Sequence, residues 1–384
     1  MKFKACAIAW MLAAKMAALS GCASAPAAPP HAPVPWLDDA FHWQAGRVEV
    51  TQDELFRVPD DLRAKLDAQV RDASPNFRLN RLITLIFGAD RRGFTYAAGH
   101  STTAAQTWNL KRGDCLSLTI LTYASARAAG LTVAMQEVRT AGIFDRRGQF
   151  DTVNQHVNAV FPRAFRDLSE DKEPRDVVVD FDPEMATSGR GTMLTQEGIL
   201  ARFYNNVAVE QLAAGEHQKA YAHFKAAIQS DPRYAASYAN LAVLYQTVHR
   251  DGEAERLLRT ALGLSDQNDV ALQGLHQLLL RQGRSAEARQ YALQIDARRE
   301  SDPYHWIGVG VKHLQSGEPR RAIRALERAK ELAVGFPEVH RYLAVAYAQA
   351  GDRRRADQEL TVLASSGFDQ GKLSVLRKKV HSLQ

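Results

Sequence analysis

The second half of the sequence repeats itself every 34 residues, and this period constrains the fold more strongly than any other feature. A small residue recurs at Ala220, Ala254, Ala288, Ala322 and Ala356. A larger aliphatic residue recurs at Val207, Leu241, Leu275, Val309 and Leu343. A turn position recurs at Gly215, His249, Gly283, Gly317 and Gly351. Alanine at a fixed place lets two helices approach closely, so the period predicts a stack of helix pairs.

These spacings resemble the tetratricopeptide repeat, a unit of two antiparallel helices. The resemblance covers five units between residues 201 and 370, and Lys372 to Val380 is expected to form a capping helix. The whole repeat domain is placed at residues 196–384. His276 stands where the family has a small residue, so the third unit is expected to be distorted.

The repeats imply a groove lined by the first helix of each unit. Its expected positions are nearly uncharged: Asn205, Val209, Ala239, Val243, Gln273, Gln277, Ile307, Val311 and Arg341. Such a surface suits an extended neutral or apolar peptide better than an acidic tail. The alternative is that the array is only a spacer or a dimer surface.

The first residues have the pattern of an export signal. Lys2 and Lys4 precede an apolar segment, and Leu19-Ser-Gly-Cys22 follows it. This ending resembles the lipobox of bacterial lipoproteins, which implies that residues 1–21 are removed and that Cys22 is lipidated. With Ala23 next, the resemblance implies the outer membrane, with the body facing the periplasm. An uncleaved membrane anchor is the alternative, although the run is shorter than the ~20 apolar residues that span a bilayer.

Residues 22–35 are rich in proline and alanine and are expected to form an extended tether. The chain has 49 Lys and Arg against 43 Asp and Glu, but three of the lysines lie in residues 1–21, so the excess beyond that point falls to three. Such a small excess does not indicate a nucleic-acid partner.

Cys115 is the third and last cysteine, after Cys6 in the signal and Cys22 at its end. It follows the polar turn Asn109-Leu-Lys-Arg-Gly-Asp and opens an apolar segment that runs to Gly130. The segment predicts a helix whose unpaired N–H groups and dipole favour a thiolate at Cys115. The alternative is that Cys115 is a small buried core residue.

The segments around this helix predict an α+β domain at residues 36–195. Apolar spacing predicts helices over 58–73 and 78–87. Alternation predicts strands over 131–138, 155–161 and 176–182, with a polar hairpin or loop over 142–149. One helix carrying the sulfur would therefore be followed by antiparallel strands.

His156 is the only histidine between Cys115 and the repeats. It lies on the strand expected at 155–161, and the next strand offers Asp180 and Asp182 on one face, because strand side chains alternate with a period of two. A thiol needs a base, and the base needs a third group to orient it. Either aspartate could complete the triad on these grounds.

Several segments resemble the transglutaminase-like superfamily: residues 103–119 around Cys115, residues 126–131, Gln136-Glu-Val, Gln155-His-Val-Asn and Val178-Val-Asp-Phe. The resemblance covers roughly residues 80–185 and implies a papain-like core. It also implies Cys115 as the nucleophile, His156 as the general base and acid, and an aspartate as the orienting group. The Val-Val-Asp-Phe run favours Asp180, and Asp182 is the alternative.

The expected activity is attack of the Cys115 thiolate on an amide carbonyl, through a thioester, by a cysteine peptidase or amidase. The Cys115 backbone N–H is expected to stabilise the oxyanion, with a second donor from residues 101–106. Release by an amine would make the enzyme a transglutaminase. The repeats would recruit a protein substrate or partner, and contact with the membrane would be through the lipid alone.

A different reading is a non-catalytic envelope scaffold, in which the papain-like core only binds protein. Neither reading requires a cofactor or a metal, since one cysteine and one histidine fall short of a zinc ligand set.

Overall fold

A computed structural model describes residues 33–382 of the chain, apart from 47, 49, 89–92, 98, 139–143, 148–149, 154–155, 166–174, 182–190, 267, 333–336, 366–367 and 369. The chain divides into two units, Met1–Val34 and Pro35–Gln384, and the second is described below. The expected export signal and Cys22 lie outside the described residues. None of the described helices is long and apolar enough to cross a membrane.

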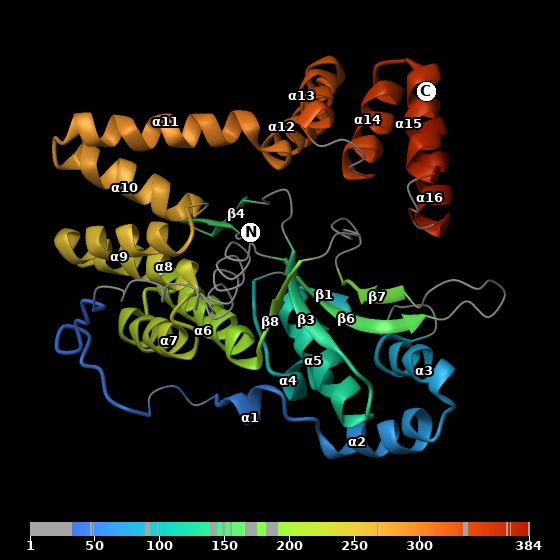
Figure 1. The fold of residues 1–384 in the computed structure, drawn as a ribbon, viewed down its shortest axis with the longest axis horizontal. Helices are drawn as coiled ribbons and strands as arrows, with labels where there is room; N and C mark the ends of the chain where they lie inside the picture. Colours follow the sequence, from blue (N-terminus) through green and yellow to red (C-terminus); the bar gives the residue numbers. More distant parts are fainter. Residues whose placement is uncertain are drawn as a thin grey trace, which may run out of the picture. The chain divides into compact units, whose positions relative to one another are not determined.

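The second unit begins with a mixed α/β region that contains a small antiparallel sheet (Figure 1). Its helices are α1 (Gln52–Leu55), α2 (Asp60–Leu66), the π-helical turn η1 (Asp67–Arg71), α3 (Pro75–Phe87), α4 (Ala104–Leu110) and α5 (Cys115–Ala128). Its strands are β1 (Thr95–Tyr96), β2 (Arg112–Gly113), β3 (Ala134–Val138), β4 (Phe144–Arg147), β5 (Phe150–Val153), β6 (His156–Phe165), β7 (Arg175–Val179) and β8 (Thr192–Leu194).

The main sheet has four strands in the order β7-β6-β3-β8. All three pairings are antiparallel, and Val138 lies opposite His156 while Val179 lies opposite Ala159. The expected strands over 155–161 and 176–182 are therefore neighbours, as predicted. β3 is shorter than expected at its start, and the region 142–149 contains strand β4, which pairs with β5.

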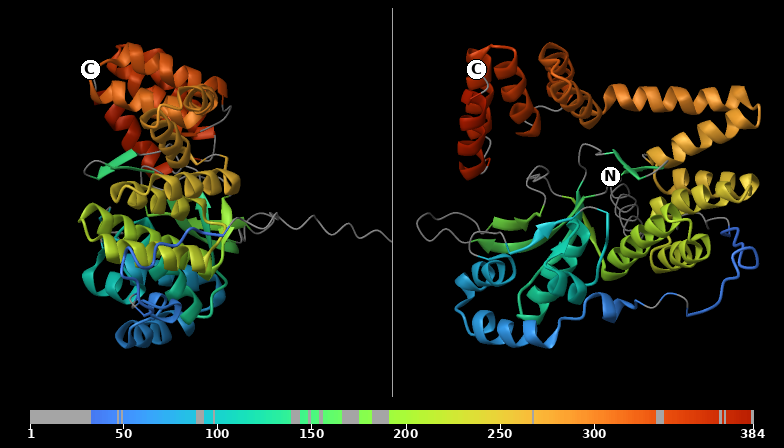
Figure 2. Two further views of the ribbon diagram at one scale, coloured as in Figure 1. Left: turned by 90° about the vertical axis from the view of Figure 1, so that its left-hand side faces the viewer. Right: turned by 180° about the vertical axis from the view of Figure 1, so that it is seen from behind.

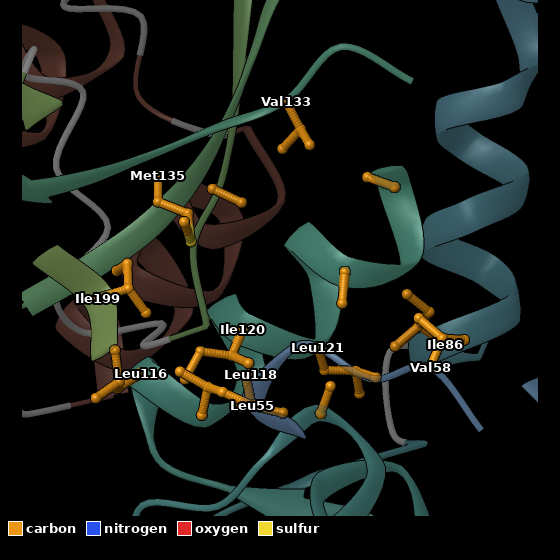
Figure 3. Packing of buried hydrophobic residues seen from close by; sticks show 14 of the residues in the cluster. Leu55, Val58, Ile86, Leu116, Leu118, Ile120, Leu121, Val133, Met135 and Ile199 are labelled. Carbon is orange, nitrogen blue, oxygen red and sulfur yellow. The ribbon is translucent and has the colours of Figure 1, made fainter. Parts of the chain in front are cut away.

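Helix α5 is the centre of the hydrophobic core. Most of its residues are buried, and the core gathers side chains from α1, α2, α3, α5, β3 and α6 around it (Figure 3). A helix covered on nearly every side needs no charged stripe, and the polar residues that α5 buries are the small Ser117, Thr119, Thr122 and Ser125. Ile199 and Phe203 of α6 (Gln196–Ala213) belong to the same core, so it extends into the first helix of the repeats.

Five helix pairs resembling tetratricopeptide repeats follow, and the views from the side and from behind trace them in sequence (Figure 2). The pairs are α6 with α7 (His217–Ser230), α8 (Ala235–Thr247) with α9 (Asp251–Leu264), α10 (Asp269–Arg281) with α11 (Ser285–Ser301), α12 (Pro303–Gln315) with α13 (Pro319–Leu332), and α14 (Pro337–Gln349) with α15 (Arg353–Ser365). Helix α16 (Gln370–Ser382) follows the fifth pair, where a capping helix was predicted.

Eight of the ten helix positions in the period are buried as expected, whereas Val207 and Val309 are half-buried. All five alanines of the small position are buried, and Leu241, Leu275 and Leu343 are fully buried. All five turn positions have a positive φ, between 57° and 81°. His249, at 57°, is the member of this set without a glycine. The 34-residue period therefore identifies the left-handed turn residues as well as the buried positions.

The third pair departs from the others, as expected from His276. His276 Nδ1 lies 3.0 Å from the carbonyl oxygen of Ala288 in α11, so an imidazole ring contacts the partner helix where a small residue was expected. Within Ser285–Ser301, a helix of 17 residues, Ala288 alone is buried. Another core cluster includes Ile307 of the fourth pair.

Residues 35–43, here called the N-terminal strap, lie against α7 and α8. Lys225 Nζ is 2.7 and 2.8 Å from the two carboxylate oxygens of Asp38, and 3.7 Å from the ring centre of Trp43. Tyr221 donates a hydrogen bond to Asp38, and Phe41 stacks on the Tyr221 ring at 4.5 Å. The strap thus supplies an anion and aromatic faces to a buried lysine of the first repeat.

Candidate active site

Cys115 is the first residue of α5, and its thiol is free and nearly buried, with 6% of the residue exposed. Asp114 caps the helix: its Oδ1 accepts hydrogen bonds from the backbone N–H of Ser117 at 2.7 Å and from the Ser117 hydroxyl at 2.6 Å. The cap fixes the first turn, whose N–H groups and dipole favour negative charge at the sulfur.

Asp114 is itself held from the segment before α4. Ser101 donates to Asp114 Oδ2 at 2.6 Å, and the Thr102 N–H donates to the Ser117 hydroxyl at 2.8 Å. Asn206 of α6 donates to the Ser101 hydroxyl at 3.0 Å. These donors satisfy the hydrogen-bonding capacity of both oxygens of the buried carboxylate. The same network links the nucleophile's helix to the first repeat.

His156 and Asp180 meet beside the sulfur. His156 Nε2 lies 2.7 Å from Asp180 Oδ1, and the His156 ring also forms a hydrogen bond with Cys115. Because Nε2 faces the carboxylate, Nδ1 is the nitrogen left for the thiol. Asn158 donates to Asp180 Oδ2 at 3.0 Å, so both carboxylate oxygens have a partner.

The charge of His156 follows from this setting. Burial alone would lower its pKa, but hydrogen bonds and charge interactions with Asp180 and Cys115 outweigh it and raise the pKa to about 10. The imidazolium form is therefore favoured at neutral pH. A positive ring beside a thiol at a helix N-terminus favours the thiolate.

The structure brings Cys115, His156 and Asp180 together. Asp182 lies outside the described residues. The side chains of residues 101–106 form other hydrogen bonds: Thr103 and Gln106 form a capping box at the start of α4, and the Ser101 hydroxyl donates to Asp114. The second oxyanion donor expected from this segment stays a prediction.

A cavity of about 280 Å³ opens beside Cys115. Its wall comes from α5, β3, β6, α6, α8 and α10, and includes Arg202, Asn205, Asn206, Val209, Asn240 and Asp269. Asn205 and Val209 were expected in the repeat groove and do line this cavity. Ala239 and Ile307 were expected there too, but they are fully buried, and Asn240 lines the cavity in place of its neighbour.

The near-absence of charge expected for the groove is wrong at this end. Arg202, Arg233, Asp231 and Asp269 all line the cavity. They were missed because the 34-residue period identifies the packing positions, whereas Arg202 is a charged residue inside α6, Asp231 and Arg233 lie between α7 and α8, and Asp269 begins α10.

Asn158 and Asp114 were also missed as site residues. Asn158 stands two residues after His156, so strand alternation places it on the same face. Asp114 directly precedes the cysteine, where an N-cap is expected for a helix that begins at Cys115. Among the residues that the structure describes, no three His, Cys, Asp or Glu side chains are grouped to hold a metal ion.

No protein-family model matches the sequence, and no curated protein matches it significantly. Solved structures of tetratricopeptide-repeat type match about half of the chain. Pseudomonas aeruginosa pilF is 22% identical, over 49% of this chain and 86% of its own, with a TM-score of 0.26. YrrB, described as a TPR protein with an unusual peptide-binding site, is 21% identical over 47% and 92%, with a TM-score of 0.25. MamA from Desulfovibrio magneticus RS-1 is 16% identical over 47% and 96%, with a TM-score of 0.25.

Proposed function

We propose that this chain is a transglutaminase-like cysteine enzyme that acts on amide carbonyls of a protein or peptide. One observation carries the proposal: a thiol at a helix N-terminus, an imidazole and a carboxylate form one hydrogen-bonded series, Cys115–His156–Asp180. A thiolate nucleophile, a proton carrier and a group that orients it are the parts that acyl transfer needs.

In the first half of the reaction the Cys115 thiolate attacks the amide carbon, and the carbon–nitrogen bond breaks. The His156 imidazolium gives its proton to the leaving amine, so a thioester and a free amine result. Backbone N–H groups at the start of α5 stabilise the oxyanion, an effect of about 3 kcal/mol per donor in such sites. Asp180 keeps the imidazole ring in place and stabilises its positive charge throughout.

In the second half, neutral His156 takes a proton from water or from an amine as either attacks the thioester. Water gives a carboxylic acid and makes the enzyme a peptidase or amidase, whereas an amine gives a new amide. The thiolate and imidazolium are restored in both cases. We place this chemistry in the bacterial cell envelope, with export by residues 1–21 and a lipid on Cys22 at the outer membrane.

The second candidate function is a protein-binding scaffold without turnover. It is favoured by the five helix pairs and by the low exposure of the Cys115 thiol, 6% for the residue.

The two functions are separated by incubating the full-length protein with an equimolar library of 14-residue peptides and dansylcadaverine, followed by mass spectrometry of the products. The enzyme is expected to cleave peptides or attach the amine. Cys115→Ala should abolish both products, and His156→Ala should slow them about 10²–10⁴-fold. Peptides that bind without turnover would support the scaffold. Turnover that survives Cys115→Ala would show that Cys115 is not the nucleophile and would contradict the proposed enzyme.

A further inference from the structure

We infer that Asn206, in the first helix of the repeats, is a positioning residue for Cys115. It acts through Ser101 and Asp114, which connect α6 to the first turn of α5. The inference rests on the proposed function and adds that part of the repeat array supports the nucleophile.

Residues 100–103, which lie before α4, are bonded to both helices and form neither a helix nor a strand. The backbone N–H of Ser101 donates to Glu210 Oε1 of α6 at 3.1 Å. The backbone N–H of Thr102 donates to the Ser117 hydroxyl of α5 at 2.8 Å. Side chains of α5 and α6 thus satisfy backbone groups that a helix or a sheet would otherwise satisfy. The position of this segment beside α5 therefore depends on what α6 supplies.

Asn206 and Glu210 are four residues apart, so both lie on one face of α6. Asn206 Nδ2 is 3.0 Å from the Ser101 hydroxyl oxygen. Glu210 Oε2 is 2.9 Å from His100 Nδ1, in addition to its bond with the Ser101 N–H. One helix face therefore holds two consecutive residues, His100 and Ser101, at three points.

The Ser101 hydroxyl transmits this hold to the cap of α5. A serine hydroxyl has one proton to donate and lone pairs that accept. Asn206 donates to the oxygen, and the proton points to Asp114 Oδ2 at 2.6 Å. Ser101 is 4% exposed and Asp114 is 7% exposed, so water has little access to replace either bond. Removing the Asn206 donor frees the hydroxyl to turn and loosens the carboxylate that caps α5.

The first turn of α5 is what this cap protects. Asp114 Oδ1 accepts from the Ser117 N–H at 2.7 Å, which closes the turn that begins at Cys115. The N–H groups and the dipole of this turn stabilise a thiolate only while the turn is formed. A frayed turn therefore gives less thiolate at a given pH.

Hydrogen exchange of the full-length Asn206→Ala protein tests the first step. Deuterium uptake by the peptide that contains Ser117 should become about 3–10-fold faster, which is the effect expected from the loss of one hydrogen bond. Uptake by peptides of α8 should stay as in the wild type. Asn109→Ala, at an exposed asparagine of α4, is the matched control and should change neither.

Alkylation tests the consequence for the thiol. The rate of iodoacetamide labelling of Cys115 is followed from pH 3 to pH 9 by mass spectrometry of the peptide that carries it. In Asn206→Ala the midpoint of the pH dependence should rise by about 0.5–1 pH unit, which corresponds to the same 3–10-fold effect. A small reagent is used because Asn206 also lines the cavity, where a peptide would touch it directly.

A double-mutant cycle shows whether Asn206 acts through Ser101. When Ser101→Ala is already present, Asn206→Ala should change the uptake at Ser117 by less than about 1.5-fold. A full effect in that background overturns the inference. So does an uptake or a midpoint that Asn206→Ala leaves unchanged.

An increase of uptake that is equal in α5 and α8 would also overturn the inference, because Asn206 would then stabilise the fold in general. The enzyme proposal survives each of these results. It fails separately if native Cys115 follows the labelling profile of unfolded chains.

Discussion

At the scale of the residue, His156 is the group that most clearly links the site to stability. Its pKa is raised to about 10 because hydrogen bonds and charge interactions with Asp180 and Cys115 exceed the effect of burial. A proton is therefore bound more tightly in the folded state than in the unfolded state, where the pKa of histidine is about 6.5. The stability that this proton adds is fully present below about pH 6.5 and is lost as the pH rises toward 10.

His156→Gln tests this linkage. The free energy of unfolding of the wild type should exceed that of the variant most at pH 6, and the difference should shrink steadily through pH 8 to pH 10, as measured by urea unfolding. His100→Gln is the control, because His100 forms an exposed pair with Glu210 whose contribution is small. If the difference in free energy of unfolding between the wild type and His156→Gln stays constant from pH 6 to pH 10, the linkage is contradicted.

Some residues of the site could be predicted from the sequence and others could not. His156 was predictable because it is the only histidine between Cys115 and the repeats, and both aspartates were predictable from the alternation of side chains along a strand. Continuing the register past Val179 and Ala159 places Asp180 opposite Asn158, which explains the contact that they make. The roles of Asn158, Ser101 and Asn206 depend on contacts between distant segments, which no local pattern encodes.

At the scale of the element, the turn in the second repeat is conformationally strained and is expected to lower the free energy of unfolding. His249 adopts a left-handed conformation, with φ at 57°, where the other four units have glycine. A side chain there costs about 1–2 kcal/mol, and glycine recovers part of this after its larger loss of chain entropy.

His249→Gly is therefore expected to raise the free energy of unfolding by about 0.5–1 kcal/mol. The reverse change, Gly215→Ala, at φ 77°, should lower it by about 1 kcal/mol. Urea unfolding of both variants is the measurement. A His249→Gly protein that is less stable than the wild type would show that the ring makes contacts that outweigh the strain.

Element boundaries were less predictable than element types. The helix expected over 58–73 becomes α2 followed by the π-helical turn η1, although Leu62, Leu66 and Val70 are all buried as the spacing predicts. Apolar spacing identifies the buried face and tolerates a local change of helix type. The shorter start of β3 has a similar origin, since Leu131 and Val133 are apolar but precede the first paired residue of the strand, Ala134.

At the scale of the whole molecule, the α/β region and the first repeat share one core. Ile199 and Phe203 pack with α5 side chains, and Arg202 pairs with Glu137 of β3. The change to alanine-rich helices from Ala201 was visible in the sequence. The continuity of the core was not, because composition does not reveal contacts between two domains.

The N-terminal strap gives a prediction at this scale. Lys225→Met removes the cation that holds Asp38 and contacts Trp43, a loss of about 1–2 kcal/mol. Opening of the strap, and chymotrypsin cleavage within residues 36–43, should therefore rise about 5–30-fold. Lys219→Met, in the same helix, removes an exposed pair with Glu216 and should leave cleavage unchanged. Equal cleavage of both variants would mean that Lys225 does not hold the strap.

The central claim is that the fold holds Cys115 as a reactive thiolate, and the dependence of its alkylation on pH tests this most directly. The rate of iodoacetamide labelling of Cys115 is measured from pH 5 to pH 9 in the native protein, in His156→Ala and in urea-unfolded chains. In the native protein the alkylation rate at pH 6 should lie within a few-fold of the rate at pH 9. In unfolded chains, where a thiol has a pKa of about 8.5, the rate at pH 6 should be more than a hundredfold lower than at pH 9. His156→Ala should follow the unfolded curve. A native thiol that already follows that curve, or a variant that matches the wild type, would contradict the claim.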